Sequence, residues 1–545
     1  MSRTFNTIAS NSSNLLRVLV VATIGLGLTL RLWQFSANSS LWLDELAVVR
    51  NIIHLPLKRL LFSPLEYDQM TPVGFLIVGR LLSSLIADQD WVFRVIPLVS
   101  STLTLPLIYL IGRRTIGQLP ATVATALVAL SPAMIHFSAL SKQYASDVFI
   151  CSALVYGALR IMSDNSKKRG ELFLLGLGAG VLLFFSFPAT LVACGLAAHI
   201  SVKWIVERRS GLVGLVAALG MPLATCAGLA SAMALQARSP DTASYMTAMW
   251  AHGFPPQSLM RWPDWLWGQC SNLYTSAFLG QGGEGFWAPI AAMLLSLGLI
   301  GCIALIRKKS ATALAVLTPF IMALGAAAAQ LYPLSNRLSF FLTPCLAILT
   351  AFGACVVGTF LRRFVLHAVP AACAATLAGT ILALIASPPP YIREDMRPLM
   401  ERIAAERHTT DAVYSYYAAN QAVDYYSERF GITEWDAGAC HRGNPRAYLE
   451  ELDAYRGSPR VWIIFTHVLP QYTEADVILG YLQTIGTERK ALTQHGAVAY
   501  LFDLSDPDLL NRITVQDYAF EENIPWQLES ACNKGPQSKW QRPRR

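Results

Sequence analysis

Long apolar runs alternate with short polar connections along the first 386 residues of the chain. The first run, residues 15–35, is about 20 residues long, enough to cross a hydrocarbon core of roughly 30 Å as a helix. We predict that it is a retained membrane-spanning helix; the alternative is a cleaved signal peptide, whose apolar region is shorter. Ten further spans are predicted at residues 91–111, 118–137, 146–162, 170–186, 189–206, 211–235, 286–306, 311–331, 338–358 and 364–386.

The apolar segment "MTPVGFLIVGRLLSSLIA" at residues 70–87 is predicted to be a helix lying along the outer membrane surface, with Thr71 and Pro72 at its start. Counting it as a span would reverse every later connection. Basic residues mark every second connection, which places those connections, and the N-terminus, in the cytoplasm. The basic clusters are Arg113 and Arg114, Lys167 to Arg169, Arg208 and Arg209, Arg307 to Lys309, and Arg362 and Arg363.

Residue 387 begins a region of ordinary charge content, which we predict to lie outside the cytoplasm as a small α/β domain. Strands are predicted at 411–417, 460–468 and 497–504, with helices at 420–431 and 473–486 that end at Gly431 and Gly486. The predicted fold class is therefore a polytopic α-helical membrane protein of about 11 transmembrane helices with a C-terminal α/β domain. Its predicted divisions are a membrane module at 1–386 with outer loops at about 36–90 and 237–285, an outer domain at 387–530, and a basic tail at 531–545.

Composition agrees with this division, because 54% of the 545 residues are hydrophobic and only 14% are charged. The net charge of +8 is explained by the cytoplasmic clusters, so no nucleic-acid partner is needed. Seven of the ten cysteines lie in apolar runs, and no CxxC or metal spacing occurs. Cys440 and Cys532 fall in the outer region, where they can pair if the compartment is oxidising.

Two adjacent carboxylates, Asp44 and Glu45, stand in "SLWLDELAVV" just after the first span. One interpretation is that they only complement the dipole of a helix start. The other is that they are functional, because ionisable groups beside a membrane are costly unless they are paired or lie in a watery cavity. The sequence around them leaves both interpretations open.

A second polar group, "SALSKQYASD" at residues 138–147, contains Lys142, Gln143, Tyr144 and Asp147 at the outer end of a predicted span. Lys142 and Asp147 either form a structural ion pair or serve a substrate. Arg337, in "YPLSNRLSFF", opens a later span on the outer side, against the positive-inside rule, where a lipid phosphate is its natural anion. The outer loop at 240–284 is rich in aromatic residues, which either form an interface belt or line a substrate groove: Trp250, Trp262, Trp265, Trp267 and Tyr274.

The order of these motifs resembles the GT-C superfamily of membrane glycosyltransferases, and within it the branch of protein O-mannosyltransferases and the lipid A aminoarabinose transferase. The resemblance covers about residues 15–385 and is carried by "LWLDE", the Pro-led surface helix, "FRVIPLVSSTLTLPLIYLIGRR", "LSPAMIHFSALSKQYASD" and "YPLSNRLSFFLTPCLAIL". It implies transfer of a sugar from a polyprenyl-phosphate donor to an acceptor hydroxyl on the outer face of the inner (plasma) membrane, with inversion.

The resemblance also implies roles for individual residues. Asp44 would be the general base, and Glu45 would orient the acceptor or a cation. Lys142 and Arg337 would bind the donor phosphate, near Tyr144 and Asp147. The acceptor is expected to be a glycan, a lipid or a protein.

Two features depart from the family pattern. Many relatives have Glu and Arg where this chain has Lys142 and Gln143 before Tyr144. No DxD metal motif stands here, so we expect no divalent metal or other cofactor, although Asp44 with Asp147 would be the pair to hold a metal. The alternative functions are a lipid or sugar transporter or flippase, which typically has repeated halves and intramembrane polar residues, and a non-catalytic membrane scaffold with an outer binding domain.

Overall fold

The computed structural model describes residues 2–86, 89–163, 169–207, 212–236, 239–280, 284–441, 444–468 and 474–519. The chain divides into two compact units, each assembled from segments that are distant in sequence. The first unit comprises Met1–Ala37, Thr71–Arg238 and Met246–Tyr391. The second comprises Asn38–Met70, Ser239–Tyr245 and Ile392–Arg545. Residues 38–70 of the predicted first outer loop therefore group with the C-terminal region, an association that the predicted division at residue 386 does not contain.

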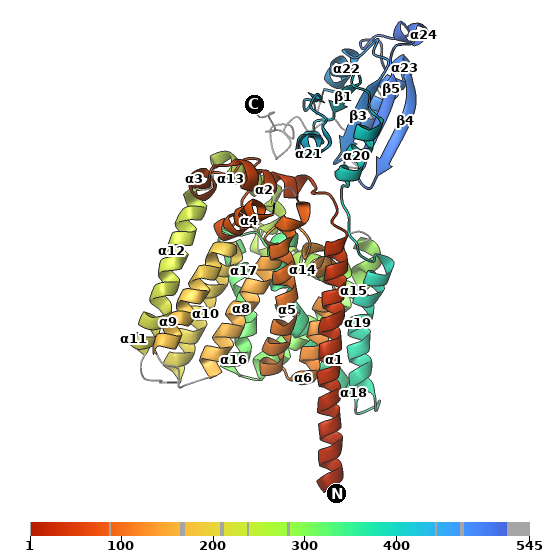
Figure 1. Cartoon of the computed structure of the whole chain (residues 1–545). Coiled ribbons are helices and arrows are strands. Elements are labelled where there is room, and N and C mark those ends of the chain that lie inside the picture. The colour runs from red at the N-terminus through yellow and green to blue at the C-terminus, as the bar shows by residue number, and fades with distance from the viewer. Residues whose placement is uncertain are drawn as a thin grey trace. The chain divides into compact units, whose positions relative to one another are not determined.

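The first unit is helical, and its long helices run side by side (Figure 1). Its helices are α1 (Ser2–Ser36), α4 (Val73–Leu85), α5 (Val95–Thr115), α6 (Gln118–Leu130), α7 (Pro132–Phe137), α8 (Tyr144–Ser163), α9 (Arg169–Leu182), α10 (Phe187–Val206), α11 (Leu212–Leu215), α12 (Met221–Gln236), α14 (Trp262–Tyr274), α15 (Glu284–Arg307), α16 (Ala311–Leu314), α17 (Thr318–Ala328), α18 (Thr343–Leu361) and α19 (Ala368–Ala386). α13 (Pro240–Met249) has residues in both units.

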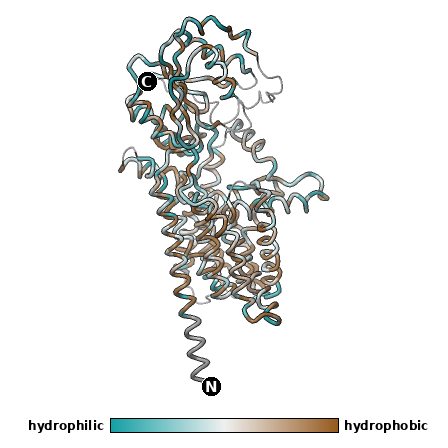
Figure 2. Tube along the Cα trace, turned by 90° about the vertical axis from the view of Figure 1, so that its right-hand side faces the viewer, coloured by the Kyte–Doolittle hydropathy of each residue, from teal (hydrophilic) through white to brown (hydrophobic). Residues whose placement is uncertain are grey.

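Among the described residues, nine helices are long and apolar enough to cross a membrane, and each overlaps one predicted span. Hydrophobic residues gather along these helices (Figure 2). The other two predicted spans, 118–137 and 170–186, contain the shorter apolar helices Gln118–Leu130 and Gly170–Phe185. The predicted polytopic α-helical membrane protein is thereby confirmed. A helix is present at the position of the predicted surface helix as α4, which begins directly after Pro72. That it lies along the outer membrane surface stays a prediction.

The predicted span at 118–137 is two helices because the chain breaks at Ser131. The Ser131 backbone is not helical, and its hydroxyl accepts a hydrogen bond from the Met134 N–H at 3.0 Å, which starts α7. α6 therefore ends at Leu130, and its last carbonyl groups lack the next helical turn as donors. Proline at position 132 fits the first turn of α7, where an N–H would have no helical partner.

Arg31 of α1 satisfies these carbonyl groups. Its fully buried guanidinium donates to the carbonyl oxygens of Val128 and Ala129, each at 3.2 Å, and to the Ser101 hydroxyl at 2.7 Å. A cation in a membrane-spanning helix is costly unless its donors are satisfied. Arg31 thus ties the broken end of α6 to α1 and α5.

A close backbone contact joins α15 and α18 at a pair of glycines. A Cβ atom at Gly301 would lie 1.9 Å from the Leu349 carbonyl oxygen, and one at Gly353 would lie 1.9 Å from the Leu297 carbonyl oxygen. Only glycine permits this approach, as in other small-residue contacts between membrane helices.

The second unit contains a five-stranded sheet of order β2-β1-β3-β5-β4. β2, β1 and β3 are parallel, whereas β5 pairs antiparallel with both β3 and β4. The strands are β1 (Ala412–Ser415), β2 (Asp436–Ala437), β3 (Val461–Thr466), β4 (Thr487–Gln494) and β5 (Ala497–Asp503). The helices are α2 (Leu43–His54), α3 (Leu57–Phe62), α20 (Met396–Glu406), α21 (Asn420–Ser427), α22 (Pro445–Asp453), α23 (Glu474–Ile485) and α24 (Pro507–Leu510).

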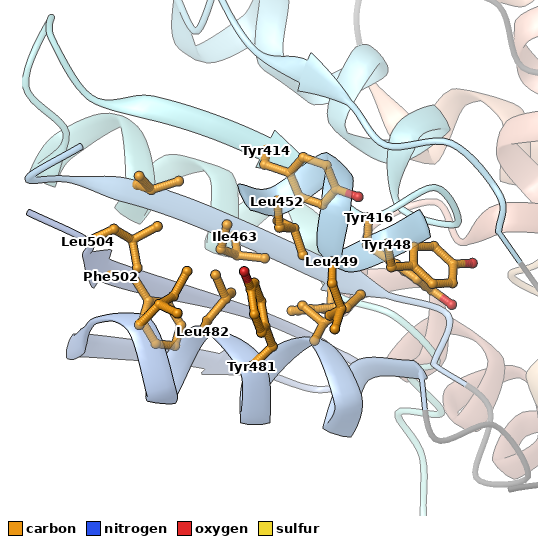
Figure 3. Packing of buried hydrophobic residues seen from close by; sticks show 14 of the residues in the cluster. Tyr414, Tyr416, Tyr448, Leu449, Leu452, Ile463, Tyr481, Leu482, Phe502 and Leu504 are labelled. Carbon is orange, nitrogen blue, oxygen red and sulfur yellow. The ribbon is translucent and has the colours of Figure 1, made fainter. Parts of the chain in front are cut away.

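The core of the sheet region is formed by aromatic and aliphatic side chains of the strands, α22 and α23 (Figure 3). Tyr481 and Leu482 of α23 pack with Ile463 and Phe502 of the sheet. The three predicted strands are present as β1, β3 and β5, whereas β2 and β4 were not predicted. The small C-terminal α/β domain is confirmed. Gly431 has φ +67° at the end of its helical segment, the left-handed conformation that a helix C-terminus favours.

The seven cysteines of the apolar runs are free, as expected for cysteines that serve as small apolar residues. Cys270, which lies in a polar segment, is also free. Cys440 is disulfide-bonded. Its predicted partner, Cys532, and the predicted basic tail at 531–545 lie outside the described residues. Their pairing remains a prediction.

Candidate functional site

The start of α8 buries an unusual number of polar side chains. Lys142, Gln143 and Asp147 are 5%, 8% and 5% exposed. The chain reaches α8 through a tight turn in which the Lys142 N–H donates to the Leu140 carbonyl at 2.7 Å. The Lys142 side chain brings a positive charge into this buried polar group, so the position is a candidate for binding an anion.

Asp147 stands in the first turn of α8. Ser186 caps α10 by accepting from the Ala189 N–H at 3.3 Å. The predicted part of Asp147 in substrate binding stays a prediction.

Arg337 lies in the 3₁₀ segment η8 (Asn336–Leu342) and contacts two aromatic rings. Its Cζ atom is 5.8 Å from the ring centroid of Tyr144 and 5.4 Å from that of Trp250. Aromatic faces attract a guanidinium group while leaving the N–H groups in its plane able to bind oxygen. The structure thus brings together two predicted site residues, Arg337 and Tyr144.

The loops that carry Trp250 and Arg337 are bonded to each other. The Leu334 N–H donates to the Gly253 carbonyl at 2.8 Å, and the His252 Nε2 atom lies 2.7 Å from the Ser335 hydroxyl. A Cβ atom at Gly253 would lie 2.8 Å from Pro333 Cβ, so the two backbones pass closely there. Sequence reasoning named Trp250 only within a group of aromatic residues and did not name His252.

Tyr332 adds a neutral polar group to the same region. Its hydroxyl donates to the Leu338 carbonyl at 2.9 Å. Burial raises the pKa of Tyr332 well above its usual value, and the neighbouring Asp147 carboxylate raises it further. Tyr332 therefore stays protonated at any physiological pH and acts here as a hydrogen-bond donor.

Asp44 and Glu45 belong to the second unit, on the first turn of α2. Glu45 is 1% exposed, and its carboxylate lies 3.4 Å from the Trp42 N–H at the helix start. That position is the reciprocal half of a capping box, which favours the helix-start interpretation for Glu45. Asp44 is only partly buried and is the more accessible of the two carboxylates.

The residues that the structure describes contain no group of three or more His, Cys, Asp or Glu side chains placed to hold a metal ion. The expectation that no divalent metal is required remains a prediction.

A family model described as dolichyl-phosphate-mannose-protein mannosyltransferase matches residues 70–227. This range contains α4 and the start of α8 with Lys142, Tyr144 and Asp147. No curated protein matches the chain in sequence.

Three solved structures illustrate the similarity in fold. An archaeal oligosaccharyltransferase from Archaeoglobus fulgidus, in complex with an inhibitory peptide and a dolichol-phosphate, has a TM-score of 0.49 at 11% identity over 90% of this chain and 74% of its own. ArnT from Cupriavidus metallidurans, bound to undecaprenyl phosphate, has a TM-score of 0.48 at 13% identity over 88% of this chain and 97% of its own. A mycobacterial arabinofuranosyltransferase has a TM-score of 0.44 at 13% identity over 91% of this chain and 40% of its own.

Because these TM-scores are below 0.5, we draw no functional conclusion from the solved structures. The family match covers three of the motifs on which the sequence resemblance rests, namely the Pro-led helix α4, the segment at residues 93–114 and the polar start of α8. It confirms that this chain, a multi-pass membrane protein, resembles the GT-C superfamily of membrane glycosyltransferases.

Proposed function

We propose that the protein is a glycosyltransferase that moves a sugar from a polyprenyl-phosphate donor to an acceptor hydroxyl. The observation that carries this proposal is the family match at residues 70–227, which contains the buried Lys142. The description of that family names a sugar attached to a lipid phosphate. We place the reaction on the outer face of the cytoplasmic membrane, in line with the positive-inside pattern of the connections.

The leaving group of this reaction is a lipid phosphate. As the bond to the anomeric carbon breaks, negative charge grows on the phosphate, and cations already in position stabilise it. We assign this part to Lys142 and Arg337. The two rings that contact Arg337 support the assignment, because they restrict the guanidinium before any donor arrives.

The attacking group is an acceptor hydroxyl, which must lose a proton. We assign the proton acceptor to Asp44, the more accessible carboxylate of α2, and give Glu45 the supporting role at the helix start. Direct attack of the hydroxyl opposite the leaving phosphate would invert the anomeric centre. No covalent sugar intermediate, and so no nucleophilic residue, is required.

Purified protein incubated with a radiolabelled polyprenyl-phosphate sugar tests the proposal. An enzyme consumes the donor and produces free polyprenyl phosphate together with a labelled product. A transporter would move the donor across a vesicle membrane without consuming it, and a scaffold would do neither. Intact donor after incubation with every acceptor class, namely glycan, lipid and protein, would overturn the proposal.

A further inference from the structure

The helix that carries Asp44 is a core element of the second unit. Several apolar residues of α2 are completely buried, at 0% exposure: Leu46, Ala47, Val48, Val49 and Ile52. α2 packs on α21 of the α/β region. A helix buried to this degree takes its position from the surface against which it packs.

The chain before α2 is bonded to the segment that precedes α20. The Ser40 hydroxyl donates to Asp395 Oδ1 at 2.6 Å, and the Ser40 N–H reaches the same oxygen at 3.1 Å. The Arg397 N–H donates back to the Ser40 hydroxyl at 2.7 Å. Charged hydrogen bonds of this kind are the stronger class, so the approach to α2 is fixed.

Three side chains of the C-terminal region hold the start of α2, at the N-cap residue Trp42 and the first helical residue Leu43. The Trp42 ring lies 4.4 Å from the Arg393 Cζ atom and stacks on His467 at 6.4 Å between centroids. The Leu43 N–H donates to Glu394 Oε2 at 3.3 Å, while Glu394 Oε1 lies 2.7 Å from His467 Nδ1. These contacts hold the two residues immediately before Asp44, Trp42 and Leu43.

The body of α2 is held by α21. Arg50, which is 3% exposed, forms an ion pair with Asp424. The Tyr426 hydroxyl of the same helix accepts a hydrogen bond from the Leu41 N–H at 2.8 Å. Asp44 is therefore bracketed in sequence by contacts to the C-terminal region on both sides.

We propose that the C-terminal α/β domain is the support that positions Asp44, with Glu394 and Asp424 as its main positioning residues. This inference rests on the proposed function, since it assigns a purpose to the geometry of Asp44. A general base must be held close to its productive geometry, and a misplacement of about 1 Å can cost about 100-fold in rate. The domain thus contributes to turnover without touching the sugar.

Variants of the full chain separate positioning from general stability. Asp424→Asn removes the charge that faces Arg50, and Asp424→Glu retains it. Glu394→Gln independently removes the negative charge that contacts the Leu43 N–H and His467. Asp503→Asn is the matched control, because Asp503 forms an ion pair with Arg489 at 2.8 Å in the same domain, and its side chain is 20% exposed against 19% for Asp424.

Two readouts are needed. Hydrogen exchange of the peptide covering residues 41–54 should rise about tenfold or more in Asp424→Asn and Glu394→Gln, because each loses a charged contact. Turnover should fall about tenfold or more with the KM for a polyprenyl-phosphate sugar unchanged, since these residues position the base and do not bind the donor. Asp424→Glu should restore most of the protection from hydrogen exchange and most of the turnover. Asp503→Asn should change neither the exchange nor the turnover.

Normal exchange or normal turnover in both Asp424→Asn and Glu394→Gln would overturn the inference, and so would an equal loss in Asp503→Asn. Asp44→Asn separates this result from a failure of the proposed function. If Asp44→Asn transfers sugar normally, the assignment of the base fails, and positioning of a base fails with it. If Asp44→Asn is inactive while the network variants are normal, the inference alone fails.

Discussion

Asp44→Asn is the substitution that tests the proposed chemistry most directly. The amide keeps the size of the carboxylate and its place in the first turn of α2 while removing its ability to accept a proton. A positioned general base is typically worth about 100- to 10,000-fold in rate, or about 2.7–5.4 kcal/mol. Turnover at saturating donor should fall by at least about 100-fold.

The effect of the same substitution on stability should be small. Asp44 is partly exposed at the positive end of the α2 dipole, where a carboxylate contributes about 0.3–1 kcal/mol. We therefore expect the melting temperature to fall by no more than about 4 °C. A catalytic role would therefore appear as a large loss of turnover with little loss of stability, whereas a purely structural role would leave turnover almost unchanged.

The assay is the transfer rate of purified variants at saturating polyprenyl-phosphate sugar, with a thermal melt of each. Glu45→Gln is the matched control, because its amide oxygen can still accept from the Trp42 N–H, so it should cost less turnover than Asp44→Asn. Near wild-type transfer by Asp44→Asn would refute the assignment of the base. Asp44 would then only complement the helix dipole.

Four further predictions concern other parts of the chain. Arg337→Lys should weaken donor use partly and Arg337→Ala much more, because only arginine offers a bidentate fork; equal, near-normal kinetics would make Arg337 an interface anchor. A reporter that is active only outside the cytoplasm, fused after Ala386, should be active; cytoplasmic activity would contradict the predicted topology. Burial acts to raise the pKa of Asp411, but hydrogen bonds, led by that of Arg460, lower it overall. The Asp411–Arg460 ion pair should therefore contribute its full stability above about pH 4, the unfolded pKa, and lose this contribution as the pH falls through the lower folded pKa. The difference in melting temperature between wild type and Arg460→Gln should be largest at pH 6 and shrink progressively below about pH 4; a difference that stays constant on acidification would contradict this. Gly353→Val should lower the yield of folded protein in detergent, because its Cβ would lie 1.9 Å from a carbonyl oxygen; a normal yield and melt would contradict the close contact of α15 and α18.

The membrane-spanning helices were predictable because about 20 consecutive apolar residues have few other interpretations. The break of the predicted span 118–137 into two helices at Ser131 was not predicted, because a serine in an apolar run does not by itself indicate that a helix starts there. β4 was also not predicted. Of its eight residues only Leu492 is buried, so it lacks the alternating pattern by which a half-buried strand is recognised.

The polar residues of the candidate site could be named from the sequence, but their partners could not. Arg337 stood out because it opposes the positive-inside rule, whereas its contact with Trp250 depends on two loops about 85 residues apart. Arg31 was missed altogether, since its acceptors lie about 70 to 100 residues further along the chain. Such pairings are set by tertiary packing, and a single sequence gives no local signal for them.

The discontinuous second unit has a consequence for biosynthesis. The segment Asn38–Met70 leaves the ribosome more than 300 residues before Ile392–Arg545, with which it packs. At about 5–20 residues per second, α2 must wait on the order of 15–60 s for the partner that fixes it. During that interval the membrane helices can insert while the segment carrying Asp44 has no support. A nascent or truncated chain that lacks the α/β region would therefore be membrane-integrated, and under the proposed function it would be inactive until that region has been synthesised.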